Sequence, residues 1–331
     1  MDYIECFLGA PEPYKLSGLE KIALAGAALQ QVRKEMLNSG YEHRLTEPYY
    51  PEQRIVKWLD MLNQTPVAQL FMGYYHPKLF GAENIPSETG AMLVANHSTI
   101  FFADMAPIYF GVHEQKRRCV YGLAYKMLGQ SDFLKTIGGV QGRMESAVRL
   151  LEDDRLVLVC PGGILDACKP FYNRYFVRPV EGFSPENCGY AKAAYMAGKP
   201  IIPVGVIGAE ETLLTFADMK PLVEKLMAGL DRMFGLKKIP RLKELYQLVD
   251  FAKVIPLPAN LLPFKNDVEA YAGNQIDVRA IAGENPSQRD FARANAVVMD
   301  TLQGIIDRGL AKRKGLTGLT ALMKHAIETV L

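Results

Sequence analysis

A histidine in a short polar turn is the residue best placed in this sequence for acid–base chemistry. His97 follows the apolar run 91–95, which is short enough for a buried strand. It lies between Asn96 and Ser98, two residue types that cap helices. A histidine held at a strand end beside a carboxylate, here Asp104, is a common arrangement of a general base with its orienting acid. The simpler alternative is a helix-cap histidine near a surface aspartate.

The spacing between His97 and Asp104 sets a condition on the chain that joins them. A helix is expected over 99–110, and a regular one would carry Asp104 about 10 Å beyond His97 along its axis. The two side chains can meet only if this helix begins late or contains a bulge. Asp166 is the second candidate for the carboxylate partner of the histidine.

Other turns carry residues suited to binding a polar substrate. Pro161-Gly162-Gly163 ends the apolar run 156–160, and its glycines let a substrate approach the backbone and leave amide donors available. Gly142 precedes Arg143, whose planar guanidinium can bind a phosphate with two parallel hydrogen bonds. Lys169 adds positive charge that could meet the phosphates of a substrate. The plainer interpretations are a strand-ending turn, a surface salt bridge and a solvated lysine.

In chain order, four segments resemble the four-block signature of the glycerolipid acyltransferase superfamily, which includes the lysophospholipid acyltransferases. They are Asn96-His97, Gly139-Val140-Gln141-Gly142-Arg143, Pro161-Gly162-Gly163 and Pro200-Ile201-Ile202-Pro203-Val204. The resemblance covers about residues 65–313. Two positions depart from the family pattern. Phe102 stands where the first block usually has its aspartate, and Gly162 replaces the usual glutamate, which is similar to the branch of diacylglycerol and phytyl-ester-type acyltransferases.

The resemblance implies transfer of a fatty acyl group from a thioester to the hydroxyl of a glycerolipid or lysophospholipid. The donor is acyl-CoA or acyl carrier protein, acting as co-substrate, and no other cofactor and no metal is implied. His97 and Asp104 would be catalytic. The substrates would contact Asn96, Gly142, Arg143, Pro161, Gly162, Gly163, Asp166 and Lys169. Lysophosphatidic acid, another lysophospholipid, diacylglycerol and a long-chain alcohol all remain possible acceptors. The alternative from another class is a non-catalytic lipid-binding protein on the same fold, indicated by Phe102.

The composition indicates which cellular compartment and which classes of partner to expect. The chain has 331 residues, 49% of them hydrophobic, which is enough for a sizeable core. A net charge of +2 argues against a nucleic-acid partner. The five cysteines lack the spacing of a disulfide framework or a zinc site, which suits a reducing compartment. The sequence shows no signal-peptide pattern and no apolar run of the roughly 18 residues that a spanning helix needs. We therefore expect a cytoplasmic protein bound peripherally to the inner face of a membrane.

The pattern of elements predicts an α/β fold with a mostly parallel sheet, helices on both of its faces and an N-terminal helical extension. Strands are expected at 91–95, 119–122, 156–160 and 201–206, with a late edge strand at 268–273. Helices are expected at 17–40, 51–63, 66–80, 99–110, 123–135, 144–154, 187–197 and 288–313. The expected division is an extension over 1–64, an acyltransferase domain over 65–313 and a tail over 314–331.

The segment 213–264 has a different character from the rest of the expected domain. Its first part reads as a basic amphipathic helix, a type that can lie at a membrane interface. Its last part, 254–264, is apolar and contains prolines that prevent a helix. The sequence therefore predicts a membrane-contact insertion here, with a core-packing helix and a buried loop as the alternative.

Overall fold

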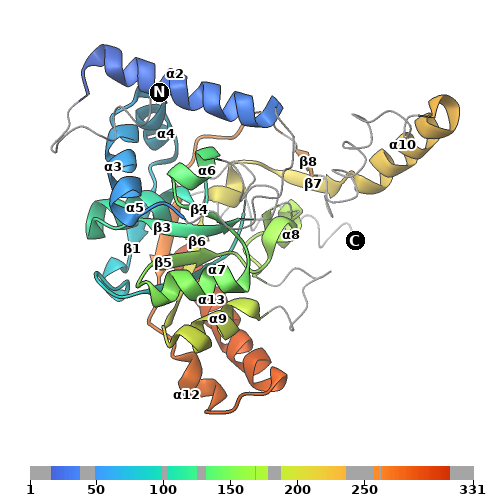
Figure 1. The fold of residues 1–331 in the computed structure, drawn as a ribbon. Helices are drawn as coiled ribbons and strands as arrows, with labels where there is room; N and C mark the ends of the chain where they lie inside the picture. Colours follow the sequence, from blue (N-terminus) through green and yellow to red (C-terminus); the bar gives the residue numbers. More distant parts are fainter. Residues whose placement is uncertain are drawn as a thin grey trace.

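A seven-stranded sheet forms the centre of the computed structural model (Figure 1). The structure describes residues 16–37, 49–98, 103–124, 132–167, 169–177, 188–235, 256–258, 260 and 262–313. The strand order is β1-β9-β6-β2-β5-β3-β4. The strands are β1 (Lys78–Phe80), β2 (Ala91–Ala95), β3 (Val120–Ala124), β4 (Gly139–Gln141), β5 (Leu156–Val159), β6 (Ile201–Ile207) and β9 (Glu269–Ala272).

The strands from β6 to β4 run parallel to one another, and β9 pairs antiparallel with β6. The carboxyl ends of β2, β5, β3, β4 and β6 therefore meet at one edge of the sheet, where open α/β sheets bind ligands. The predicted α/β fold with a mostly parallel sheet is confirmed.

Helices cover both faces of the sheet, and β2 contributes to the core on each side. Met92 and Val94 pack into the cluster under α7, α9 and α13, while Ala91, Leu93 and Ala95 pack into the cluster under α4 and α5. This alternation explains why β2 is apolar at every position. The helices of the core are α4 (Pro66–Tyr75), α5 (Ala106–Lys116), α6 (Asp132–Thr136), α7 (Met144–Glu152), α8 (Gly163–Ala167), α9 (Gly189–Ala197), α12 (Val278–Ala282) and α13 (Gln288–Lys312).

Four of the expected elements differ in the structure. The helix expected over 99–110 is α5, which begins only at Ala106. The strand β9 was expected at an edge, but it lies inside the sheet between β1 and β6. The edge strand β1 was expected to be the end of a helix over 66–80, but α4 stops at Tyr75 because His76 adopts a left-handed conformation with a φ of 38°. The helix expected over 123–135 begins too early, since β3 extends to Ala124 and the described helix is α6. The strand β4 was not predicted.

The N-terminal extension contributes α2 (Gly18–Leu37) and α3 (Glu52–Leu62). The buried face of α3 includes Ile55 and Leu59, which join the main core cluster, and Trp58, which packs with α2. The carboxylate of Glu52 forms ion pairs with Arg118 and Arg155. Apolar packing and buried ion pairs therefore fix α3 to the α/β core.

A second sheet consists of two antiparallel strands, β7 (Thr215–Asp218) and β8 (Pro256–Pro258). The helix α10 (Lys220–Phe234) directly follows β7 in the chain. In Figure 1, α10 extends away from the body of the molecule at the right of the view. None of its residues is buried. The structure therefore excludes the alternative that α10 is a helix packed into the core. Within the described ranges, none of the helices combines the length and the apolar character needed to span a membrane.

Candidate active site

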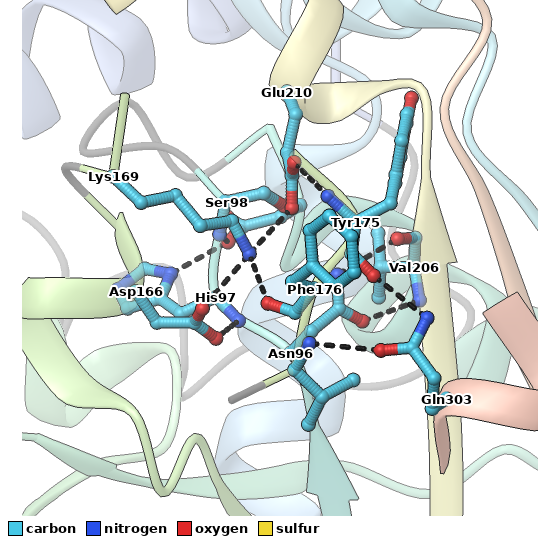
Figure 2. A network of polar contacts seen from close by, with 12 residues as sticks. Asn96, His97, Ser98, Asp166, Lys169, Tyr175, Phe176, Val206, Glu210 and Gln303 are labelled. Atoms are coloured by element: carbon cyan, nitrogen blue, oxygen red, sulfur yellow. Dashed lines mark hydrogen bonds and ion pairs between the residues drawn. The ribbon is translucent and has the colours of Figure 1, made fainter. Parts of the chain in front are cut away.

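Asn96, the first residue after β2, uses its side-chain amide to hydrogen-bond the main chain of the neighbouring strand β6 (Figure 2). The Asn96 amide donates from Nδ2 to the carbonyl of Val206 (2.9 Å), and its Oδ1 accepts the Val206 N–H (2.7 Å). Asn96 is buried, and this pair of hydrogen bonds ties the end of β2 to β6. The sequence assigned Asn96 to substrate binding, whereas the structure directs its amide to the neighbouring strand.

His97 and Asp104 lie in hydrogen-bond contact. His97 Nδ1–H donates to Asp104 Oδ2 at 2.6 Å, and the same oxygen accepts the main-chain N–H of Ser98 at 2.8 Å. The side chain of Asp104 is fully buried and that of His97 is 26% exposed. The contact is possible because α5 begins only at Ala106, so Asp104 lies in the turn before the helix. The late start that the spacing requires is therefore present; Phe102 falls outside the described residues.

The surroundings of His97 favour its protonated form. Burial alone would lower the pKa of the imidazole, but the charge and the hydrogen bond of Asp104 outweigh it and hold the pKa above its ordinary value. Asp166 adds to this effect and Lys169 opposes it. Because Nδ1 carries the hydrogen that Asp104 accepts, Nε2 is the nitrogen that can take up a proton in the neutral ring.

Asp166 contacts the main chain of the histidine and not its ring. Asp166 Oδ2 accepts the His97 N–H at 2.9 Å, and Oδ1 accepts from Lys169 Nζ at 2.8 Å. Of the two candidate partners, the structure therefore pairs Asp104 with the imidazole. The Lys169 ammonium is buried and also forms an ion pair with Glu210 at 2.9 Å. This differs from the expectation that Lys169 meets a donor phosphate, because its charge is matched by two carboxylates inside the protein.

Glu210 also belongs to the site, although it was not among the residues predicted from the sequence. It lies in the short helix η3 (Ala209–Glu211) directly after β6. An acidic residue that follows an apolar strand of a parallel sheet was the available signal, the same one that identified His97. Burial raises the pKa of Glu210 to about 7, although the charge of Lys169 opposes this rise.

The Pro161-Gly162-Gly163 turn follows β5, which pairs with β2, so it lies beside the His97 turn at the same sheet edge. The structure gives a steric reason for Gly162. A Cβ added at this position would lie 2.4 Å from the Cβ of Asp166. Gly163 adopts a positive φ of 53°, which glycine accepts without strain. The turn therefore leaves space for the Asp166 side chain as well as an open backbone surface.

Gly142 and Arg143 follow β4 at this edge, but three strands away from β2. The spacing of neighbouring strands places the ends of β2 and β4 roughly 14 Å apart. Gly142 donates its N–H to the Ala124 carbonyl at 2.7 Å, and Arg143 is half-buried at the start of α7. The structure thus places Arg143 at the same sheet edge as His97, with β5 and β3 between their strands.

The site as a whole combines a histidine–carboxylate pair with a glycine turn and a more distant guanidinium. This arrangement can remove a proton from a hydroxyl and support the resulting imidazolium. No group of three or more His, Cys, Asp and Glu side chains that could hold a metal ion occurs among the residues that the structure describes.

The elevated pKa of His97 can be measured without any assay of activity. We expect the His97 ring to titrate above the ordinary histidine value of about 6.5 in an NMR titration. The Asp104→Asn variant should lower the pKa of His97, because it removes the negative charge of Asp104 that stabilises the imidazolium. The His97→Ala variant identifies the signal. An unchanged His97 pKa in Asp104→Asn would contradict the pairing.

The chain matches the family model described as acyltransferase over residues 76–207. It is 26% identical over 255 residues to an uncharacterized protein of Mycobacterium leprae, an alignment that covers 74% of this chain and 63% of that protein. The chain thus spans less than two thirds of that relative. It is 27% identical over 161 residues to phytyl ester synthase 2 of Arabidopsis thaliana, covering 44% of this chain and 22% of that enzyme.

A comparison of folds gives a match to the crystal structure of the 1-acyl-sn-glycerophosphate acyltransferase of Thermotoga maritima. The match has a TM-score of 0.45 and 14% identity, and it covers 89% of this chain and 99% of that one. The matched family segment begins at His76 before β1 and ends at Ile207, the last residue of β6. It contains the His97 turn, Arg143 and the Pro161-Gly162-Gly163 turn. Over residues 76–207, the chain is therefore similar to the acyltransferase family, and this segment holds the His97–Asp104 pair of the site.

Proposed function

We propose that this protein transfers a fatty acyl group from a thioester to the hydroxyl of a glycerolipid or lysophospholipid, with His97 as the general base. The donor is acyl-CoA or acyl carrier protein. The observation that carries the proposal is the hydrogen bond between His97 and the buried Asp104 at the carboxyl edge of the sheet, inside an acyltransferase domain. The retained His97–Asp104 pair also favours an enzyme over a non-catalytic lipid-binding protein.

The reaction can be written with this geometry so that atoms balance. Neutral His97 takes the hydroxyl proton at Nε2 while the acceptor oxygen attacks the thioester carbonyl. The new C–O bond forms, the C–S bond breaks, and the proton passes from Nε2 to the leaving sulfur. Asp104 keeps the ring in the required tautomer and stabilises the imidazolium that forms in between. The open backbone at Pro161-Gly162-Gly163, beside His97, is the proposed position of the acyl group.

The His97→Ala variant should lower acyl transfer at least ~10²-fold, because loss of a general base removes a factor of this size. The assay follows thiol release from acyl-CoA, which for a transferase depends on the added acceptor. The control is His76→Asn, which alters another histidine–aspartate pair, the 2.9 Å contact of His76 with Asp267. If His97→Ala keeps half of the original rate, His97 is not the general base. If neither the unaltered protein nor His97→Ala releases thiol, the result favours the non-catalytic lipid-binding protein.

Arg143 tests which class of acceptor the site takes. Its roughly 14 Å separation from the β2 end can be bridged by two long side chains and an acceptor with a phosphate near its hydroxyl. The similarity to a phytyl ester synthase favours an uncharged alcohol instead. The proposal retains a phosphorylated glycerolipid as its first candidate, since a guanidinium matches phosphate.

The Arg143→Ala variant should raise the KM for lysophosphatidic acid about tenfold or more, the expected effect of losing a hydrogen bond to a charged group. The KM for the acyl donor should change little. The matched control is Arg149→Ala, which removes an exposed arginine of the same helix. Equal KM values for the acceptor in all three proteins would assign an uncharged acceptor, such as diacylglycerol, to this site.

We also propose that α10 holds the protein at the membrane from which it takes its lipid. One side of this helix carries five apolar side chains that are 36% to 74% exposed. They are Leu222, Leu226, Leu230, Met233 and Phe234. Moving each of these side chains fully out of water contributes roughly 1.5–3 kcal/mol of favourable free energy. Partial insertion of several of them is therefore enough for reversible membrane binding. Lys225 and Arg232 add attraction to anionic lipid. This proposal places the protein on the inner face of a membrane.

Replacing Leu222, Leu226 and Met233 with serine should release the protein from anionic vesicles in a flotation assay. Turnover of bilayer-held acceptor should fall, while that of a short-chain soluble acceptor should not. Met196→Ser, at an exposed apolar residue of α9, is the matched control. If the folded triple variant still floats, the contact lies elsewhere, and a Leu19→Ser and Ile22→Ser pair then tests α2, where both side chains are exposed.

A further inference from the structure

Three buried side chains, two acidic and one basic, lie next to His97 without contacting its ring (Figure 2). We propose that Asp166, Lys169 and Glu210 are positioning residues, which hold the main chain of His97 in place rather than bind a substrate. We call these three residues the buried triad. This inference rests on the proposed function, since it assigns a role to the triad through the base that the function requires.

The contacts of the triad form a continuous path from β6 to His97. Glu210 Oε1 pairs with Lys169 Nζ at 2.9 Å, and Lys169 Nζ donates to Asp166 Oδ1 at 2.8 Å. Asp166 Oδ2 then accepts the N–H of His97 at 2.9 Å. The far end is also fixed, because Glu210 Oε2 accepts the Tyr175 N–H at 2.6 Å. Each carboxylate thus uses one oxygen for Lys169 and the other for a main-chain amide.

Burial makes these contacts depend on one another. The side chains of Asp166, Lys169 and Glu210 are only 2%, 4% and 3% exposed. Removing one partner of a buried pair leaves an unpaired charge, which is strongly unfavourable. Lys169 therefore supplies the positive charge that faces both acidic side chains, and it also donates to the Phe176 carbonyl at 3.0 Å. No charge of the triad is left over to meet a substrate phosphate.

The glycine turn is shaped around the triad. A Cβ at position 162 would come within 2.4 Å of Asp166 Cβ and 2.8 Å of its Cγ. Any residue other than glycine would therefore displace the carboxylate that holds the His97 amide. This geometry links the Pro-Gly-Gly form of the turn to the position of the proposed base.

Three polar contacts restrain the turn that carries His97. Asn96 is bound to Val206, the His97 amide to Asp166, and the Ser98 amide to Asp104. The middle contact acts on the main chain of His97, whose ring is held separately by Asp104. A shift of about 1 Å in a catalytic group can cost 10²-fold in rate, so the loss of this contact should be visible in kcat.

The triad also acts on the charge of the ring. The groups that influence His97 are Asp104 before α5, Asp166 on α8 and Lys169 after it. Glu210 on η3 is joined to them through Lys169. The pKa of the Cys160 thiol after β5 is raised by burial and, in addition, by the charges of Asp104 and Asp166. Asp166 raises the pKa of His97, so its neutralisation should lower that pKa.

Two variants of Asp166 separate the two effects. Asp166→Ala removes the acceptor, so the His97 amide should exchange its hydrogen with solvent faster, and kcat should fall about tenfold to hundredfold. The KM for acyl-CoA should stay within about twofold, because the inferred role does not involve the substrate. Asp166→Asn keeps an acceptor oxygen but loses the charge, so it should retain more of kcat and lower the NMR pKa of His97.

The control is Glu52→Gln, which weakens another largely buried set of ion pairs, with Arg118 and Arg155, on the side of the core where α3 packs. It should lower the free energy of unfolding but leave the His97 pKa and amide exchange unchanged. A substrate-binding role for Asp166 would instead raise the KM with kcat preserved, and this result would overturn the inference. So would an unchanged His97 amide and pKa in both Asp166 variants.

If the Asp166 variants do not fold, Glu210→Gln gives the same test at the other end of the path. It leaves Lys169 with one carboxylate, and the His97 amide should again exchange faster. Amide exchange is measured without substrate, so the inference can be judged even if His97→Ala retains activity. An inactive His97→Ala combined with unaltered Asp166 variants would reject the positioning role alone and leave the proposed function standing.

Discussion

The hydrogen bond between His97 and Asp104 is the contact on which the arrangement of the site depends. It joins a residue at the end of β2 to one in the turn before α5, and so fixes both the tautomer and the direction of the ring. The same Asp104 oxygen accepts the Ser98 amide, which prevents the turn from moving independently of the ring. Because the side chain of Asp104 is fully buried, leaving its oxygens without these donors would be strongly unfavourable.

The sheet supplies the rigidity that this contact needs. β2 is buried on both faces and is paired on both edges, with β5 and β6. A strand enclosed in this way leaves the sheet at a fixed point, and the polar residues that follow it emerge where the ends of β5 and β6 also lie. The glycine turn comes from β5 and Glu210 from β6, so strand order alone brings these distant parts of the chain to His97.

The parts of the fold that could be predicted are those encoded by local pattern. The apolar runs of β2 and β5 are uninterrupted, and β6 departs from this pattern only at Pro203 and Gly205. The His97–Asp104 pair needed only the correct start of one helix. The interior place of β9 could not be predicted, because a short alternating strand looks the same at an edge. The roles of Asn96 and Lys169 were also hidden, since their partners, Val206 and Glu210, are set by strand order. A lysine is rarely buried unless its charge is matched, and nothing near Lys169 in sequence shows that a second carboxylate joins Asp166.

The pH dependence of kcat/KM for acyl transfer by the unaltered protein tests the central claim most directly. If His97 is the base, the rate must rise with pH as the imidazole loses its proton, and the midpoint must equal the NMR pKa of His97. The account predicts that both values lie above the ordinary histidine value of about 6.5, because Asp104 and Asp166 together stabilise the imidazolium more than burial and Lys169 disfavour it. A rate that stays constant through the His97 titration would contradict the account.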